Sequence, residues 1–176
     1  MTPLYRELDC PDYDAINAEL LTWIESQPGL CSSDQFWNPV ELKSLLSSCP
    51  KFAKWCRSLH LRLKTVAVTV GRDPECCGPH TDTPPARFKL SWPVKNTQGT
   101  WNCWYQPRIT QPKSVINQLG GATYLDRSEL EEIGRREVLR PAIIDAGIIH
   151  DVIAESDAKW PRIGLQGQFF IEPQNL

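Results

Sequence analysis

Apolar residues recur at helical spacing in the first third of the chain. Residues 12–27 predict a first helix that ends before the turn signal at 28–29. Residues 39–46 predict a second, with Asn38 as its cap, and residues 50–59 a third. The buried face of the first helix is expected at Ile16, Leu20, Trp23 and Ile24.

The period changes near residue 61, where β-branched residues fill positions 61–71 and predict a strand. Residues 87–94 alternate, which predicts a second strand with two distinct faces. One face carries Phe88, Leu90, Trp92 and Val94, and the other Arg87, Lys89 and Ser91. A hairpin turn at 96–99 then leads into an aromatic strand over 100–106.

The last third continues in short strands, expected over 142–145, 148–154 and 162–171. A capping-box pattern predicts a short helix at 128–131. Helices followed by many short strands indicate an α+β, mainly β fold, with helices outside a β-sandwich or barrel. We expect one domain over 1–176, with 1–60 as helical support and 61–172 as the β core.

Composition excludes several classes of protein. The chain has 176 residues, of which 41% are hydrophobic and 23% charged, and this is typical of a globular domain. A net charge of −2 provides no basic field for duplex nucleic acid, although a local patch remains open (Arg57, Arg62, Lys64, Arg72). No apolar stretch approaches the roughly 20 residues of a membrane span. The charged N-terminus and seven cysteines, an odd number, favour a cytoplasmic protein with reduced thiols.

Four residues suggest chemistry. His80 and Asp82 are separated by one residue, His150 follows an apolar run, and Arg162 lies twelve residues beyond it. Two imidazoles and one carboxylate are the facial triad of non-haem Fe(II) oxygenases, which occupies one face of an octahedral ion. Each residue alone also has a structural interpretation, as a loop histidine, a turn cap, a core histidine or a solvated strand arginine. One hypothesis accounts for all four.

These residues resemble the Fe(II)/2-oxoglutarate-dependent oxygenases, whose pattern is His-x-Asp, a distal His, and then an Arg often followed by x-Ser. The matches are His80, Asp82, His150 and Arg162, while Gly164 stands where that Ser is common. The resemblance covers about residues 61–172. It implies a double-stranded β-helix, a cupin-like jelly roll, with N-terminal supporting helices. The stretches 86–94 and 101–105 look like a prolyl-hydroxylase-like branch found in marine microbes and their viruses, which would place the protein in a host cytoplasm if it is viral.

The resemblance also implies roles for the residues. His80, Asp82 and His150 would hold Fe(II), and Arg162 would bind the remote carboxylate of 2-oxoglutarate. Dioxygen would be the second cosubstrate. Ser91 and Tyr105, on strands expected to line the barrel, are candidate helpers in cosubstrate binding. Arg87 and Trp104 are candidate substrate contacts, although Trp92, Trp101 and Trp104 are most simply core residues, and His60 is expected to be structural or exposed.

The expected function is hydroxylation of a C–H bond with release of succinate and CO2, on a peptide side chain such as proline, with a small molecule as the other option. Two other interpretations keep the fold: a jelly-roll metalloenzyme that does not use 2-oxoglutarate, and a non-catalytic β-sandwich binding module. A zinc site at Cys76 and Cys77 is a further alternative, but adjacent cysteines without a second pair do not match the usual spacing.

Overall fold

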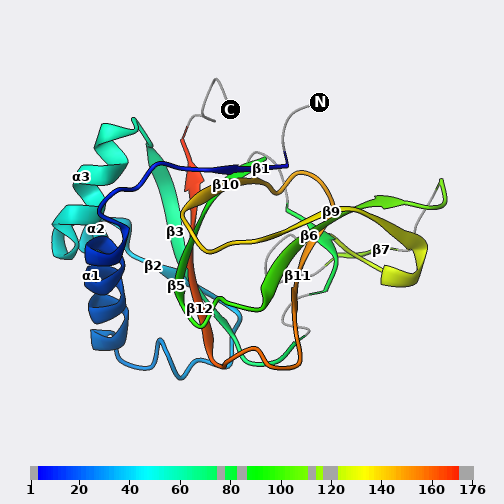
Figure 1. The fold of residues 1–176 in the computed structure, drawn as a ribbon, viewed down its shortest axis with the longest axis horizontal. Coiled ribbons are helices and arrows are strands. Elements are labelled where there is room, and N and C mark those ends of the chain that lie inside the picture. The colour runs from blue at the N-terminus through cyan, green and yellow to red at the C-terminus, as the bar shows by residue number, and fades with distance from the viewer. Residues whose placement is uncertain (1–3, 75–77, 83–86, 111–113, 117–122, 171–176) are drawn as a thin grey trace.

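The described residues form two antiparallel sheets of six strands, with three helices on one side (Figure 1). The computed structural model describes residues 4–74, 78–82, 87–110, 114–116 and 123–170. Within these residues, no helix is long and apolar enough to cross a bilayer.

The first sheet contains, from edge to edge, β1 (Tyr5–Glu7), β10 (Ala142–Asp145), β5 (Phe88–Lys95), β12 (Arg162–Phe169), β3 (Leu63–Gly71) and β2 (Trp37–Val40). The second contains β7 (Ser114–Ile116), β8 (Thr123–Leu125), β4 (His80–Thr81), β11 (His150–Ala154), β6 (Thr100–Pro107) and β9 (Leu130–Glu137). The helices are α1 (Tyr13–Ser26), α2 (Leu42–Ser48) and α3 (Pro50–Ser58), and a 3-10 turn, η1, spans Arg127–Glu129.

The strand order is that of a jelly roll. When β3, β4, β5, β6, β9, β10, β11 and β12 are counted one to eight, the two sheets have the central orders 6-3-8-1 and 2-7-4-5. The chain therefore passes repeatedly between the sheets, as in the double-stranded β-helix. The predicted fold class, a mainly β α+β jelly roll with N-terminal helices, is confirmed.

The helices cover the outer face of the first sheet, and β5 shows why. Its predicted alternation is confirmed, since Leu90, Trp92 and Val94 belong to the main core, which includes buried side chains of all three helices. The Trp92 ring lies 5.0 Å from the Trp55 ring and 5.4 Å from the Phe52 ring, centre to centre. The intervening residues of β5 therefore point to the other side, into the space between the sheets.

Replacing Trp92 with alanine is expected to destabilise the protein by about 3–5 kcal/mol, because it removes a fully buried tryptophan at the junction of helices and sheet. Urea unfolding followed by circular dichroism measures the loss. Trp101→Ala is the matched control, since Trp101 is only half-buried and packs against the smaller cluster. Equal destabilisation by the two variants would contradict the central role of Trp92.

Three local predictions were wrong. Residues 96–99 do not close a hairpin, because β5 before them and β6 after them belong to different sheets. Pro39 lies within β2, where it pairs with Ala67 of β3, so the second helix begins only at Leu42. Proline is tolerated there because β2 is an edge strand. The predicted helix at 128–131 is instead the short turn η1, in which the Asp126 side chain accepts a hydrogen bond from the Ser128 amide, and β9 follows directly. Residues 1–60 also supply two edge strands, β1 and β2, which the sequence pattern did not predict.

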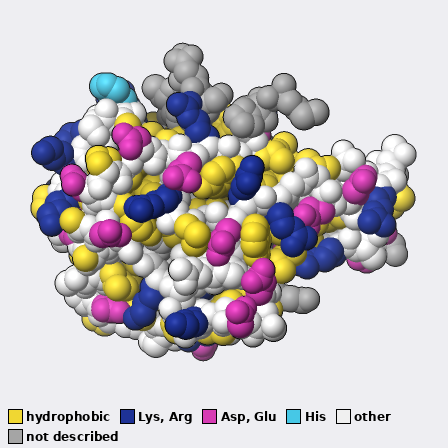
Figure 2. All heavy atoms as spheres, viewed as in Figure 1, with side chains coloured by type: hydrophobic (Ala, Val, Ile, Leu, Met, Phe, Trp, Pro, Cys, Tyr) yellow, Lys and Arg dark blue, Asp and Glu magenta, His cyan; other side chains and the backbone are white. Residues whose placement is uncertain are grey.

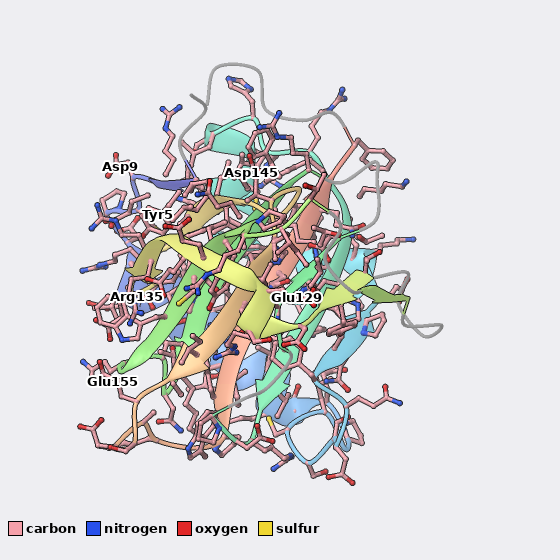
Figure 3. All side chains as sticks on the ribbon, turned by 90° about the vertical axis from the view of Figure 1, so that its right-hand side faces the viewer. Tyr5, Asp9, Glu129, Arg135, Asp145 and Glu155 are labelled. Carbon is pink, nitrogen blue, oxygen red and sulfur yellow. The ribbon has the colours of Figure 1, made fainter. Side chains whose placement is uncertain are left out.

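A smaller apolar cluster lies on the second sheet and contains Cys103, Tyr105, Leu130 and Ile149. Figure 3 views the molecule from this side, with β9 in front and Arg135 and Glu129 labelled. On the face drawn in Figure 2, basic and acidic side chains are interspersed and neither sign dominates. This mixed surface agrees with the small net charge of −2.

Candidate metal centre

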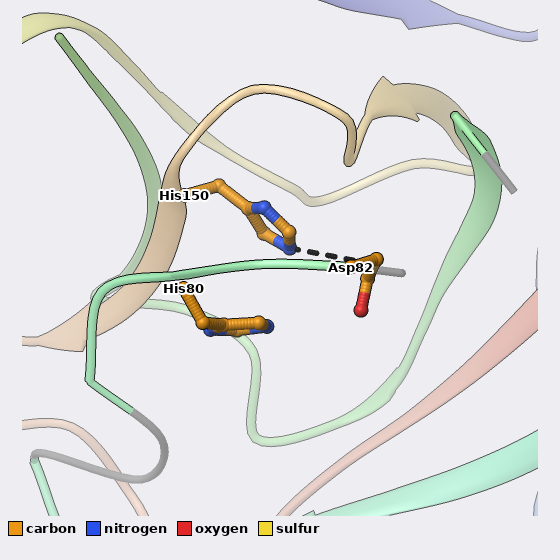
Figure 4. Close-up of side chains that lie close together, drawn as sticks. All are labelled: His80, Asp82 and His150. Carbon is orange, nitrogen blue, oxygen red and sulfur yellow. Dashed lines mark ion pairs between the residues drawn. The ribbon is translucent and has the colours of Figure 1, made fainter. Parts of the chain in front are cut away.

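The jelly roll brings the two histidines together by strand pairing. His80 on β4 and His150 on β11 are direct partners in the antiparallel register, although 70 positions separate them in sequence. Direct partners project from the same face of a sheet, so both rings point to one side. Asp82 follows β4, held by a hydrogen bond of 3.2 Å from its amide to the Ala146 carbonyl, and its carboxylate faces the rings (Figure 4).

Each imidazole is oriented in the same way by its own backbone. His80 Nδ1 lies 2.9 Å from the Gly78 carbonyl oxygen, and His150 Nδ1 lies 2.9 Å from the Ile148 carbonyl oxygen. A carbonyl accepts only, so these contacts place a proton on Nδ1 of each ring. In this tautomer of a neutral ring, Nε2 has a lone pair that points to the centre, which is how metal-binding histidines are commonly oriented.

The geometry suits a single ion. One ligand atom from each of His80, Asp82 and His150 lies within 4.8 Å of the others, and His150 Nε2 is 3.8 Å from Asp82 Oδ2. In the described part of the chain, no other group of three or more His, Cys, Asp or Glu residues meets this criterion. Two nitrogens and one carboxylate on one side match a divalent metal with open positions opposite.

Burial and charge keep His150 neutral. Burial, with the neighbouring His80, lowers the pKa of the His150 imidazole to about 4. At neutral pH the ring therefore carries no proton on Nε2 that a metal ion would have to displace. The Asp82 carboxylate, which acts against this shift, is the smaller influence.

This shift predicts that the metal-free protein loses stability as the pH falls below about 6.5. The unfolded chain binds a proton on His150 near its ordinary pKa, whereas the folded chain resists it until about pH 4. The loss expected between pH 7.5 and pH 5.5 is about 1 kcal/mol. Urea unfolding in EDTA measures it, with His150→Gln as the matched variant. An equal pH dependence in both proteins would show that His150 is not the cause.

A cavity of about 170 Å³ opens in front of the three residues, between the two sheets. Its walls are both aromatic and polar: Phe36, Trp37, Lys89, Asn102, Tyr124, Val152, Gln166 and Gln168 line it with the triad. The sequence alone predicts only that Lys89 lies on the polar face of a strand. In the structure its ammonium group is buried and lies 2.5 Å from Asp82 Oδ2. Lys89 therefore lines the cavity although it is not part of the sequence motif formed by the two histidines, Asp82 and Arg162.

Arg162 lies deeper between the sheets and does not line this cavity. It is buried, and its Nε donates a hydrogen bond of 3.1 Å to the Thr100 hydroxyl. Along the inner face of β6, Thr100 is two positions from Asn102, which does line the cavity. A polar row therefore runs from the triad through Asn102 to Thr100 and Arg162, with about 6.6 Å between alternate residues of a strand.

Gly164 has a clear steric role beside Arg162. A Cβ atom at this position would lie 2.8 Å from the Thr69 hydroxyl oxygen and 3.9 Å from Arg162 Nη1. The Thr69 hydroxyl thus occupies the space that a serine at 164 would need. Thr69 Oγ1 and Asn102 Nδ2 are buried and have no hydrogen-bond partner within the described residues. Both atoms can therefore form hydrogen bonds to a ligand in this interior.

The other predicted site residues are dispersed. Ser91 is buried beside Gln166 on the inner face of β5, while Tyr105 packs in the smaller apolar cluster. Arg87 forms an ion pair of 2.9 Å with the buried carboxylate of Asp145. Trp104 is buried, and its indole N–H donates to the Asp145 carbonyl, as a core residue would.

Two further predictions concern cysteine and histidine. The zinc alternative rests on Cys76 and Cys77, which lie outside the described residues. His60 is exposed in the turn after α3, at a φ of 55°, as the sequence suggested.

Comparisons with known proteins give the following. No family model matches the chain, and no curated protein matches it. Among solved structures, a hydroquinone 1,2-dioxygenase complexed with Cd2+ and 4-hydroxybenzonitrile is similar at 16% identity and a TM-score of 0.32, over 61% of this chain and 58% of that one. The L-ribose isomerase of Cellulomonas parahominis, without ligand, is similar at 12% identity and a TM-score of 0.39, over 97% of this chain and 88% of that one. Its complex with L-psicose gives 13% identity and the same TM-score. Likeness of this degree assigns no activity to this chain.

Proposed function

We propose that this protein is an Fe(II)- and 2-oxoglutarate-dependent dioxygenase that hydroxylates a C–H bond. The observation that carries the proposal is the triad itself. Two histidines paired across β4 and β11 present their Nε2 atoms beside a carboxylate, at the mouth of a jelly-roll interior. This donor set matches the facial triad and leaves open positions toward the cavity.

The metal ligands and the cavity walls would have different roles in this reaction. His80, Asp82 and His150 would hold the metal, with the carboxylate offsetting part of its charge. Bound Fe(II) would supply activation of dioxygen, so that 2-oxoglutarate yields succinate and CO2 while one oxygen atom enters the substrate. The aromatic walls of the cavity restrict the access of water and orient the organic ligands.

The deep polar row supports a carboxylate site for 2-oxoglutarate. Arg162 supplies a cation whose planar group matches a carboxylate, and its orientation is fixed by Thr100. The buried Thr69 hydroxyl and Asn102 amide lie close to it along the inner faces of the sheets and can donate to the same anion. Thr69 would then provide the hydroxyl contact that Gly164 lacks.

A jelly-roll metalloenzyme that does not use 2-oxoglutarate is the second candidate. It is favoured by one observation, namely that Arg162 does not line the cavity in front of the triad. Such an enzyme would need the three metal ligands but not the arginine. We propose a reducing cytoplasm as the compartment for either activity, supported by five described cysteines that form no disulfide.

Anaerobic titration tests the proposal. Metal-free protein is titrated with Fe(II) and then with 2-oxoglutarate, while the visible spectrum is monitored for the metal-to-ligand charge-transfer band. A band that requires both additions is expected. Iron binding without the band would favour the metalloenzyme that does not use 2-oxoglutarate. A protein that binds no iron would instead be interpreted as a non-catalytic β-sandwich binding module.

A further inference from the structure

Lys89 is a buried cation that faces the triad from the opposite sheet. Its side chain is 5% exposed, and its ammonium group lies 2.5 Å from Asp82 Oδ2. The same group lies 4.8 Å from the centre of the Trp37 ring, which is on β2. Lys89 pairs with Gln168 across β5 and β12, so both side chains project into the cavity.

A buried ammonium group requires a compensating anion, because desolvation of an unpaired charge costs several kcal/mol. Without metal, that anion is Asp82. The proposed metal ion would draw on the same carboxylate and would add its own positive charge within the same cavity. The positive charge of Lys89 and a divalent metal together then exceeds the single negative charge of Asp82, and a ligand anion would offset part of this excess.

We infer that Lys89 binds the carboxylate of a small organic acid held against the metal. The cavity of about 170 Å³ suits a small molecule or one side chain. Phe36, Trp37 and Tyr124 provide flat apolar walls for its carbon skeleton, and the amides of Gln166 and Gln168 can donate to its oxygens. This inference rests on the proposed metal site and narrows the ligand class to carboxylic acids.

Two sources of a carboxylate are compatible with this chemistry: 2-oxoglutarate, which has two such groups, and the substrate to be hydroxylated. Arg162 is one cation in the interior between the sheets. Lys89 offers a second one beside the metal ligands. Separate titrations of the two kinds of carboxylate therefore show which ligand Lys89 receives.

The test uses Zn(II) as a redox-inert metal, and calorimetry gives the affinities of both metal and ligands. The probes are 2-oxoglutarate, and 3-phenylpropionate added to protein already mixed with 2-oxoglutarate. Lys89→Met removes the charge and keeps most of the side-chain length, Lys89→Arg keeps the charge, and Lys95→Met is the control on the same strand. Lys95 is an exposed lysine paired with Glu25.

We expect Lys89→Met to bind Zn(II) as tightly as the parent protein or more tightly, since a competing cation is removed. We expect it to bind one of the two carboxylates at least 10-fold more weakly, with Lys89→Arg partly restoring affinity and Lys95→Met unchanged. A lysine needed only for folding would instead weaken metal and carboxylate binding together.

The inference is overturned if the parent protein binds neither carboxylate, if Lys89→Met binds both with parent affinity, or if that variant loses Zn(II). The two proposals fail in different ways. Loss of 3-phenylpropionate affinity alone, in a protein that never binds 2-oxoglutarate, would support the role of Lys89 while rejecting the dioxygenase.

Discussion

Replacing His150 with alanine is expected to weaken Fe(II) binding at least about 100-fold and to reduce succinate release to background. His150 is the buried member of the triad, and its Nε2 atom points at Asp82 from 3.8 Å. Even residues that only orient a metal ligand change affinity by about 10–100-fold when mutated, so loss of a ligand has a larger effect. Calorimetry with Fe(II) under argon measures the affinity.

The matched control is His60→Ala, which removes an exposed histidine outside the triad and should leave Fe(II) binding unchanged. Circular dichroism establishes that His150→Ala remains folded. The metal-free variant should also lose the pH-dependent destabilisation that the buried imidazole causes. Retention of Fe(II) at parent affinity by a folded His150→Ala protein would reject the triad.

Replacing Arg162 with methionine is expected to weaken 2-oxoglutarate binding by about 100-fold, because a buried charged contact to a carboxylate contributes about 2–5 kcal/mol. Iron binding should persist, since Arg162 lies away from the metal ligands along the polar row. The measurement is the loss of the charge-transfer band at a 2-oxoglutarate concentration that saturates the parent protein.

Arg162 is itself buried, so a second variant separates binding from folding. Thr69→Val replaces a hydroxyl with a methyl group of similar size and leaves the arginine in place. A loss of about 10-fold in 2-oxoglutarate affinity is expected, because Thr69 Oγ1 has no hydrogen-bond partner among the described residues and is available to the ligand. Arg135→Ala, which breaks an exposed pair with Glu132, is the control. Unchanged affinity in both Arg162→Met and Thr69→Val would remove 2-oxoglutarate from the proposed function.

The triad could be predicted from the sequence because its geometry depends on only two local features. His80 and Asp82 are neighbours on one short segment, and the apolar run before His150 marks a strand that has to lie within the sheets. The alternation along 87–94 likewise predicted which residues of β5 face the helices, since Leu90 and Trp92 are apolar and belong to the main core.

Lys89 could not be assigned in the same way. In a strand with one apolar and one polar face, the polar face usually meets water, but here it meets the interior between two sheets. Only the pairing of β5 with β12 and β10, and the position of the second sheet opposite, turns a lysine on that face into a cavity residue. Pro39 was misassigned for a related reason, because a proline suits the start of a helix and also an edge strand, and tertiary context decides between them.

The shortness of β4 has a consequence for the metal-free protein. This strand has two residues, and it contacts β11 through one register pair and β8 through two. Few backbone hydrogen bonds hold β4 in place, so its local stability within the second sheet is low. An ion bound to His80 and His150 would cross-link β4 to β11 through these two side chains. Metal loading would then slow amide exchange first at β4 and β8, far more than in the helices, and the ion would be as much a part of the architecture as of the chemistry.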